Sequence, residues 1–367
     1  MQYLEPRTDV PAKDDWSTGL ILQDLRWGAR TLGGIAVVAG AGAVTCWLLP
    51  STPGNISAFV VLALVTLVCG LGPLMYRSET KAERRGLLEQ PWRRVPAQVL
   101  EKHADGTDRL LLDGVVLQGW FEDLPDMVLE RQEVFVCGPD AGGRAVLRAA
   151  GFAKMENAKV DRDEDAASSC PVRERVERPL GRPLDDAATA RAHRGMRWGV
   201  RAWLWAAVPA GAGAVVVLLS LFPVAPAGLV VGGLALVFGL LGIPTSVEIS
   251  RWYRDAVTAV ENSAQWTPVA ITLFPWQPNQ HVAGLAEMPG GLALVQFVLP
   301  DLNVVANIAD TGVMWIAGTH GDVIAVGVPR VPVLTFAAVQ PDRDTPKEDP
   351  IPPILRFHQP DFSGLPR

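Results

Sequence analysis

The chain has 367 residues, 49% of them hydrophobic, and a formal net charge of -6 at pH 7. This acidic balance argues against a nucleic-acid-binding protein, because contacts to phosphates need a basic face. The apolar residues are gathered in four blocks, separated by charged segments rich in Pro and Gly. Such segregation is typical of a membrane protein.

The first segment, residues 1–30, is expected to be cytoplasmic, and it has no apolar core of the kind found in a cleavable signal peptide. Four uncharged runs follow, at residues 31–49, 57–75, 202–222 and 227–247. Each is close to the roughly 20 residues that a helix needs to cross a ~30 Å hydrocarbon layer. Because a buried helix of a soluble protein is usually amphipathic, these runs predict four transmembrane helices.

The connections within each pair of runs, residues 50–56 and 223–226, are short and uncharged. They predict two antiparallel hairpins, residues 31–76 and 202–247. Arg and Lys flank the opposite ends of the runs, as in the segments 26–30 and 197–201. Since positive flanks are retained on the cytoplasmic side, we expect a multi-pass protein of the plasma membrane with both termini and both large soluble segments in the cytoplasm.

Each soluble segment, residues 77–160 and 248–339, predicts a small cytoplasmic β-barrel or sandwich with about four to six strands. Apolar and polar residues alternate at the start of each segment, and Gly-rich turns at 138–143 and 318–322 are expected to join its last two strands. The strands expected after the first one lie at 110–117, 133–137 and 145–148, and at 292–299, 313–317 and 323–328. Residues 161–201 read as a charged linker ending in a short helix, and residues 340–367 as a flexible Pro-rich tail.

The two halves of the chain share a series of short matches in the same order, which predicts an internal parallel duplication. The segment 26–30 matches 197–201, Leu-Pro-Asp at 124–126 recurs at 299–301, and the segment 134–138 matches 314–318. On this alignment Pro96 and Pro268 stand at equivalent strand starts, and Gly138 and Gly318 at equivalent turns. Two parallel copies are expected to pair about a pseudo-two-fold axis along the membrane normal.

Two groups of residues are candidate sites. A basic cluster crowds one cytoplasmic exit and predicts contact with anionic lipid headgroups, although the same charges would suffice to set the topology alone. Its members are Arg77, Lys81, Arg84, Arg85, Arg93 and Arg94. Small residues at packing distance, Gly228, Gly232 and Gly239, predict close helix contact, within the chain rather than between copies.

No catalytic, cofactor or metal motif stands out. The Gly-rich turns lack the Lys-Ser/Thr of a P-loop, the five histidines are dispersed, and the four cysteines have no paired spacing. The four uncharged runs also lack the ionisable residue that an ion or proton pathway normally requires. We therefore expect a non-enzymatic membrane scaffold or accessory subunit, with a protein partner or a second copy of itself. An oligomeric transporter or channel component, and a membrane enzyme with an unrecognised site, remain the alternatives.

The strand segments 95–99 and 134–140, and the high use of Ala, Arg, Val and Gly, carry one resemblance. The chain resembles integral membrane proteins of high-GC actinobacteria such as streptomycetes, and bacterial membrane proteins that attach a small β-domain to a helical hairpin. The resemblance implies no activity and no cofactor, so no functional residue is carried over.

Overall fold

The computed structural model describes residues 2–100, 107–161, 171–173, 181–221, 224–276 and 281–340, without the side chains of residues 73–79. The chain divides into two compact units. The barrel unit comprises Met1–Asp24, Ser78–Met196 and Asp255–Arg367, and the helical unit comprises Leu25–Arg77 and Arg197–Arg254. The expected tail at 340–367 lies outside the described residues from position 341 onward, and so do residues 162–170 and 174–180 of the expected linker at 161–201.

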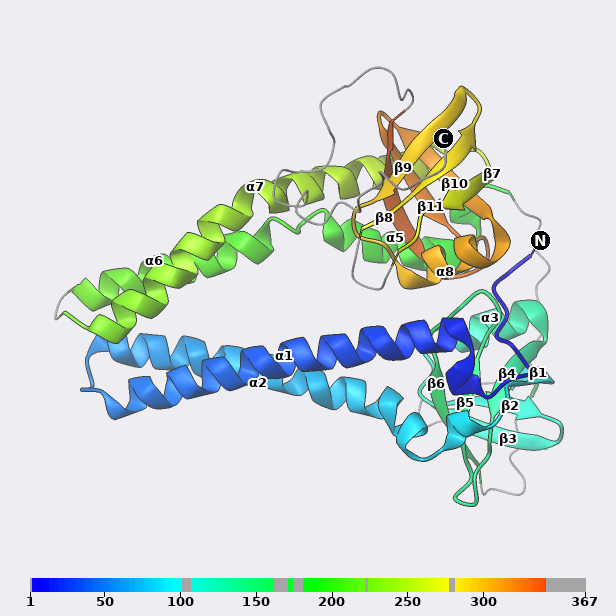
Figure 1. The fold of residues 1–367 in the computed structure, drawn as a ribbon, viewed down its shortest axis with the longest axis horizontal. Coiled ribbons are helices and arrows are strands. Elements are labelled where there is room, and N and C mark those ends of the chain that lie inside the picture. The colour runs from blue at the N-terminus through cyan, green and yellow to red at the C-terminus, as the bar shows by residue number, and fades with distance from the viewer. Residues whose placement is uncertain are drawn as a thin grey trace. The chain divides into compact units, whose positions relative to one another are not determined.

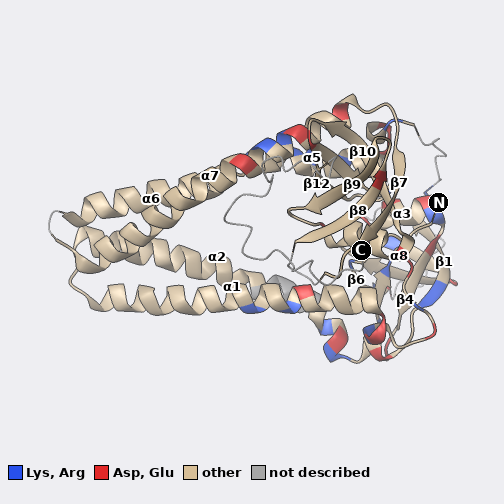
Figure 2. Ribbon diagram, turned by 45° about the horizontal axis from the view of Figure 1, so that its top comes forward, with Lys and Arg blue, Asp and Glu red and all other residues tan. Residues whose placement is uncertain are grey.

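Four long apolar helices provide the helical unit, and each is long and apolar enough to cross a membrane (Figure 1). They are α1 (Trp16–Leu48), α2 (Pro53–Arg84), α6 (Leu204–Leu221) and α7 (Pro226–Asn262). Three of them extend well beyond the uncharged runs, because a charged residue ends an apolar run without ending a helix. Lys, Arg, Asp and Glu are accordingly confined to one end of these helices (Figure 2).

The first barrel is a closed sheet of six strands with order β1-β2-β3-β6-β5-β4. Its strands are β1 (Arg93–Leu100), β2 (Asp108–Leu112), β3 (Val115–Gly119), β4 (Glu133–Cys137), β5 (Arg144–Arg148) and β6 (Glu156–Val160). Helix α3 (Leu124–Arg131) connects β3 to β4. The alternation of exposed and buried residues along β1 directs Val95, Ala97 and Val99 into the core.

The second barrel is also closed and has order β10-β11-β12-β9-β8-β7. Its strands are β7 (Thr267–Leu273), β8 (Val282–Met288), β9 (Gly291–Phe297), β10 (Val313–His320), β11 (Val323–Gly327) and β12 (Leu334–Gln340). Helix α8 (Leu302–Thr311) connects β9 to β10, and α5 (Ala187–Gly199) precedes the third long helix. Taken in chain order, the strands of the two barrels are connected and paired in the same way.

The helix of each barrel ends in the same local arrangement. Gln132 after α3 and Gly312 after α8 are both left-handed, with φ of 57° and 67°. The carbonyl of Gln132 accepts a hydrogen bond from the Ala97 amide at 2.9 Å, and that of Gly312 accepts one from the Ile271 amide at 3.0 Å. Each helix is thereby joined to the first strand of its own barrel at a matching position.

The strand expected at 110–117 was wrong, because two strands lie there. A tight turn at Asp113 and Gly114, with φ of 47° and 82°, separates β2 from β3. Positive φ at both central residues is the requirement of a type I′ hairpin turn, and Asp-Gly is its usual sequence. Strands β6, β8 and β12 were also not predicted, so the Gly-rich segments lie between the fourth and fifth strands of each barrel and not between the last two. Gly138 follows β4, whereas Gly318 lies inside β10 where the strand register shifts, so the expectation that these two glycines stand at equivalent turns was wrong.

Two further matches between the halves are also not structurally equivalent. Val95 pairs with Val134 and Val269 pairs with Met314, which places Pro96 one residue after this shared position and Pro268 one residue before it. The Leu-Pro-Asp segments also differ in place. The first forms the opening turn of α3, whereas the second precedes α8 and supplies its N-cap through Asp301. These sequence matches therefore pair residues that occupy different positions in the two barrels.

A buried ion pair joins the start of α1 to the first barrel. The Arg148 guanidinium lies 3.3 Å from the Asp15 carboxylate, and both side chains have no exposed area. Asp15 also accepts hydrogen bonds from the hydroxyl groups of Ser17 and Thr18, at 2.6 and 2.8 Å. Arg148 donates further bonds to Ser17 and to the carbonyl of Phe152, both at 2.9 Å.

Two amide side chains of α8, the buried Asn307 and the half-buried Asn303, connect the two barrels. Asn307 accepts a hydrogen bond from the Leu4 amide at 3.0 Å and donates one to the Gly151 carbonyl at 2.7 Å. Asn303 accepts from the Ala153 amide at 2.9 Å. Apolar residues of both barrels belong to one continuous buried cluster around these contacts. The two barrels therefore pack as one body.

Candidate functional site

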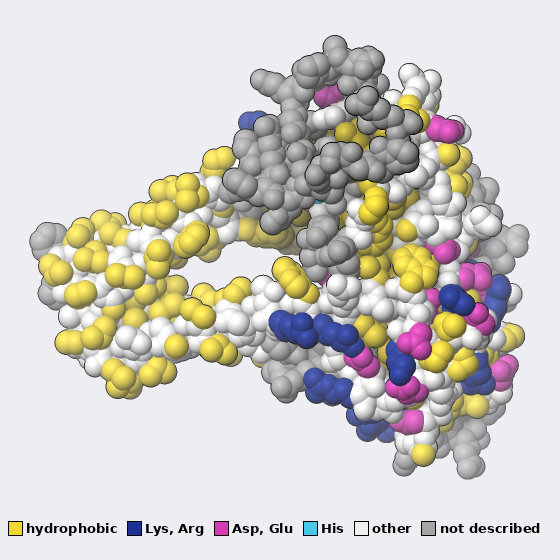
Figure 3. Space-filling view, in the orientation of Figure 1, with side chains coloured by type: hydrophobic (Ala, Val, Ile, Leu, Met, Phe, Trp, Pro, Cys, Tyr) yellow, Lys and Arg dark blue, Asp and Glu magenta, His cyan; other side chains and the backbone are white. Residues whose placement is uncertain are grey.

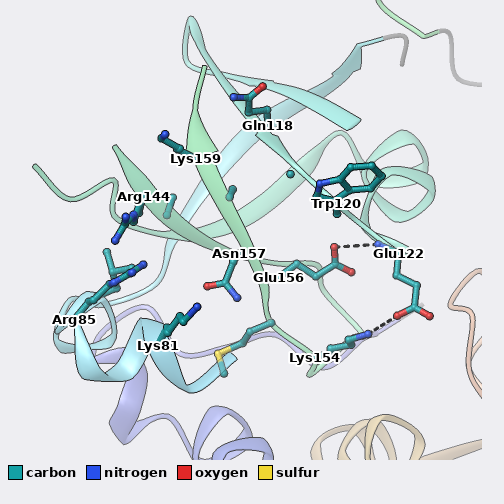
Figure 4. A pocket seen from close by; sticks show the side chains of 15 residues that line it. Lys81, Arg85, Gln118, Trp120, Glu122, Arg144, Lys154, Glu156, Asn157 and Lys159 are labelled. Carbon is teal, nitrogen blue, oxygen red and sulfur yellow. Dashed lines mark hydrogen bonds and ion pairs between the residues drawn. The ribbon is translucent and has the colours of Figure 1, made fainter. Parts of the chain in front are cut away.

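The wall of the first barrel contains a hollow of about 540 Å³ (Figure 4). It is lined from the end of α2, from β3 and the segment after it, from the start of β5, and from β6 with the residues before it. Basic side chains outnumber acidic ones in the lining. The charged lining residues are Lys81, Arg85, Arg144, Lys154, Lys159, Glu122 and Glu156.

Strand register places two of the basic residues in one row. Lys159 on β6 is the partner of Gln118 on β3 and of Arg144 on β5. Asn157 and Lys159 are exposed while Glu156 and Ala158 are buried, so the row lies on the outer face of the barrel. Arg144 and Lys159 are therefore neighbours in the lining of the hollow.

The end of α2 supplies two further cations. The helix stops at Arg84, and Gly86 then adopts a left-handed conformation with φ of 71°. The following turn buries Leu87 and Leu88 against the barrel. This local geometry directs Lys81 and Arg85 towards the hollow (Figure 4).

Glu156 is the titratable group whose environment is most unusual in the hollow. Its side chain is 7% exposed, and its Oε2 accepts a hydrogen bond from the Glu122 amide at 3.3 Å. Its Oε1 has no hydrogen-bond partner in the described part of the chain. Burial raises the pKa of Glu156 to about 7, although the nearby Lys154 acts in the opposite direction. Lys154 itself forms an ion pair with Glu122.

The six residues of the expected basic cluster are distributed over different surroundings. Lys81 and Arg85 line the hollow, and Arg84 is exposed at the end of α2. Arg93 donates a hydrogen bond to the Gly138 carbonyl at 2.9 Å, and Arg94 forms an ion pair with Glu133 at 2.7 Å. The side chain of Arg77 lies outside the described residues.

Sequence reasoning missed Arg144, Lys154 and Lys159. Arg144 and Lys159 both stand at exposed strand positions, but their neighbourhood depends on the pairing of β5 with β6. Because β6 contains only two apolar residues in its sequence Glu-Asn-Ala-Lys-Val, the alternation that would have identified it is weak.

The three glycines singled out from the sequence all lie where α7 approaches another backbone. A Cβ on Gly232 would meet the Val217 amide nitrogen of α6 at 2.8 Å, and a Cβ on Gly239 would meet the Ala210 Cα at 2.6 Å. A Cβ on Gly228 would lie 2.8 Å from the carbonyl oxygen of Gly54 in α2. Only a residue without a side chain permits this close packing within the helical unit.

The hollow is suited to binding an anion, since its cations attract negative charge. No group of three or more His, Cys, Asp or Glu residues that could hold a metal ion occurs among the described residues. A scan against protein-family models, and searches of curated proteins and of solved structures, gave no significant match.

Proposed function

We propose that the chain is a multi-pass protein of the plasma membrane whose paired cytoplasmic barrels serve as a non-enzymatic scaffold or accessory subunit. The observation that carries this proposal is the construction of the barrel unit. The two barrels are joined to each other by the buried amide of Asn307, and the first barrel is joined to the residue before α1 by the buried ion pair of Arg148 with Asp15. A rigid barrel unit of this kind, in a chain that also carries long apolar helices, suits a subunit that positions a partner in a membrane complex.

Membrane insertion is supported by the surface of the helical unit. Hydrophobic side chains cover it over much of its length (Figure 3). Val37, Val38, Trp47 and Leu48 of α1 are each more than 70% exposed. An apolar surface this extensive is unfavourable in water and is expected to face lipid.

The shared architecture of the two halves supports descent from one duplicated unit. Strand order, the position of the helix and its left-handed end are the same in both barrels. A duplicated pair of hairpins carrying barrels on one face would place both barrels on the same side of the membrane. The positively charged ends of the helices support a cytoplasmic position for that side. In this orientation Lys81 and Arg84 would be available to contact anionic headgroups.

Cysteine labelling in intact cells tests this topology. Cysteines introduced at Ser51 and Val224, in the hairpin connections, should react with an impermeant maleimide, whereas cysteines at the exposed Gln98 and Glu287 of the barrels should react only after the cells are opened. The native Cys137 is a poor reporter, because its side chain is fully buried and burial raises the pKa of its thiol to about 12. Labelling of Gln98→Cys in intact cells would reverse the orientation.

Extraction in a mild detergent tests the scaffold role. A partner that co-purifies with the full chain should be lost when the barrel unit is loosened by Asn307→Leu, and retained in the exposed-surface control Glu287→Gln. A homo-oligomer without a partner that conducts ions in reconstituted bilayers would contradict the scaffold and favour a channel component.

A further inference from the structure

Like charges face each other at the hollow of the first barrel. Arg144 and Lys159 are direct neighbours across the antiparallel pair β5–β6. Like charges in such a position destabilise a sheet, whereas an opposite pair would stabilise it. Neither side chain forms an ion pair within the described residues. Folding alone therefore gives no reason for two cations at this place.

Asp140, in the turn before β5, is a carboxylate whose hydrogen bonds are made to the backbone. Asp140 accepts hydrogen bonds from the backbone amides of Gly142 and Arg144, at 2.8 and 2.9 Å. These amide bonds, with a contribution from the charges of Arg144 and Arg85, hold its pKa below the ordinary value. Asp140 closes the turn before β5, and its single negative charge does not balance the positive charges of Lys81, Arg85, Arg144 and Lys159.

The hollow has two chemically different sides (Figure 4). Arg85, Arg144, Lys81 and Lys159 are drawn on one side, and Trp120 lies on the other. The indole of Trp120 is 79% exposed. An exposed tryptophan offers a flat apolar face with one hydrogen-bond donor, to which the organic part of a ligand can attach.

We propose that this hollow binds a phosphate-bearing ligand, with the phosphate held by Arg144, Lys159, Lys81 and Arg85 and the organic group placed against Trp120. Arginine offers a planar set of donors that matches phosphate oxygens, and lysine adds compact charge. The volume of about 540 Å³ suits a small molecule or a headgroup rather than a protein segment. The ligand can come from solution, as a soluble phosphate ester, or from the membrane, as an anionic phospholipid. The site does not depend on the proposed scaffold role.

Calorimetric titration of the full chain in neutral phosphatidylcholine nanodiscs with pyrophosphate tests the site. Loss of one charged contact typically weakens binding by about tenfold, so the double variant Arg144→Gln/Lys159→Gln should bind about 100-fold more weakly. The control is Arg94→Gln, which removes one positive charge from the same barrel away from the hollow. It should leave the affinity within about twofold.

Native mass spectrometry of the detergent-purified chain distinguishes the two sources. A phospholipid adduct present in the wild type and absent from the double variant assigns the ligand to the membrane, while pyrophosphate binding without such an adduct assigns it to solution. The proposal is overturned if neither readout depends on Arg144 and Lys159. It is also overturned if the unliganded double variant melts below the wild type, because the two cations would then serve the fold.

Discussion

The buried pair of Asp15 and Arg148 allows a quantitative prediction about the junction of α1 with the first barrel. Removing one partner of a buried pair commonly costs about 3–5 kcal/mol, since the other charge stays buried. The two residues differ in the hydrogen bonds that remain to each when its partner is removed. Asp15 retains hydrogen bonds from Ser17 and from both the amide and the hydroxyl of Thr18. Arg148 without Asp15 retains only neutral acceptors, and its Nη2 already lacks a partner among the described residues.

We therefore expect Asp15→Asn to destabilise the barrel unit by more than Arg148→Met does. The double variant should cost less than the sum of the two, because it removes both charges together. Burial lowers the pKa of the Arg148 guanidinium to about 10, which leaves it charged at neutral pH. For Asp15, burial acts to raise the pKa, but the hydrogen bonds from Ser17 and Thr18 outweigh it and the pKa is lowered. The stability that Asp15 contributes should thus be present above pH ~4 and lost as the pH falls below it.

Cys137 provides the assay, because its thiol is fully buried in the first barrel. In a background in which Cys46, Cys69 and Cys170 are replaced by Ala, its labelling rate reports how often the barrel opens. A loss of about 3 kcal/mol corresponds to labelling about 100-fold faster. The control Lys13→Gln breaks an exposed ion pair with Glu89 and should label at nearly the wild-type rate. Additive effects, or Arg148→Met labelling faster than Asp15→Asn, would refute the proposed energetics of the pair.

Three further predictions concern other positions. Because burial raises the pKa of Glu156 to about 7, the folded state binds a proton more tightly than the unfolded chain, and stability should fall as the pH rises from about 4.5 to 7. Glu156→Gln should remove up to about 3 kcal/mol of this pH dependence, which thermal unfolding between pH 4 and 8 measures. Asn307→Leu leaves the buried Leu4 amide without its acceptor, so this amide should exchange hydrogen at least about tenfold faster, and unchanged exchange would show that the contact is dispensable. Gly232→Val forces a side chain into the backbone of α6 and should cost about 1–3 kcal/mol, whereas Gly233→Val, with open space around its Cβ, should melt like the wild type.

The apolar helices were predictable from the sequence because the signal is carried by composition alone. Residues 57–75 and 227–247 contain no charge, and no neighbouring segment is needed to recognise them. The barrels were predicted only in outline. Strand β1 alternates in the expected way, but the turn at Asp113–Gly114 was read through as a single strand although it carries a hairpin sequence. Helices α3 and α8 were missed because, at 8 and 10 residues, they offer barely two turns of periodic pattern.

The hollow could not be predicted for a different physical reason. Its cations come from the end of α2 and from two strands whose registry is fixed by barrel closure, a property of the whole sheet. In the sequence, Arg144 and Lys159 are 15 positions apart and each looks like an ordinary solvated charge. Only the pairing of β5 with β6 places them at facing positions of the sheet, where like charges are unfavourable. Two like charges at facing positions, which the fold does not require, are a stronger indication of an anionic ligand than the number of charges in the hollow. A phosphate bound between the two side chains would offset the unfavourable interaction between them. Ligand binding should therefore raise the melting temperature of the wild type while leaving that of Arg144→Gln/Lys159→Gln unchanged.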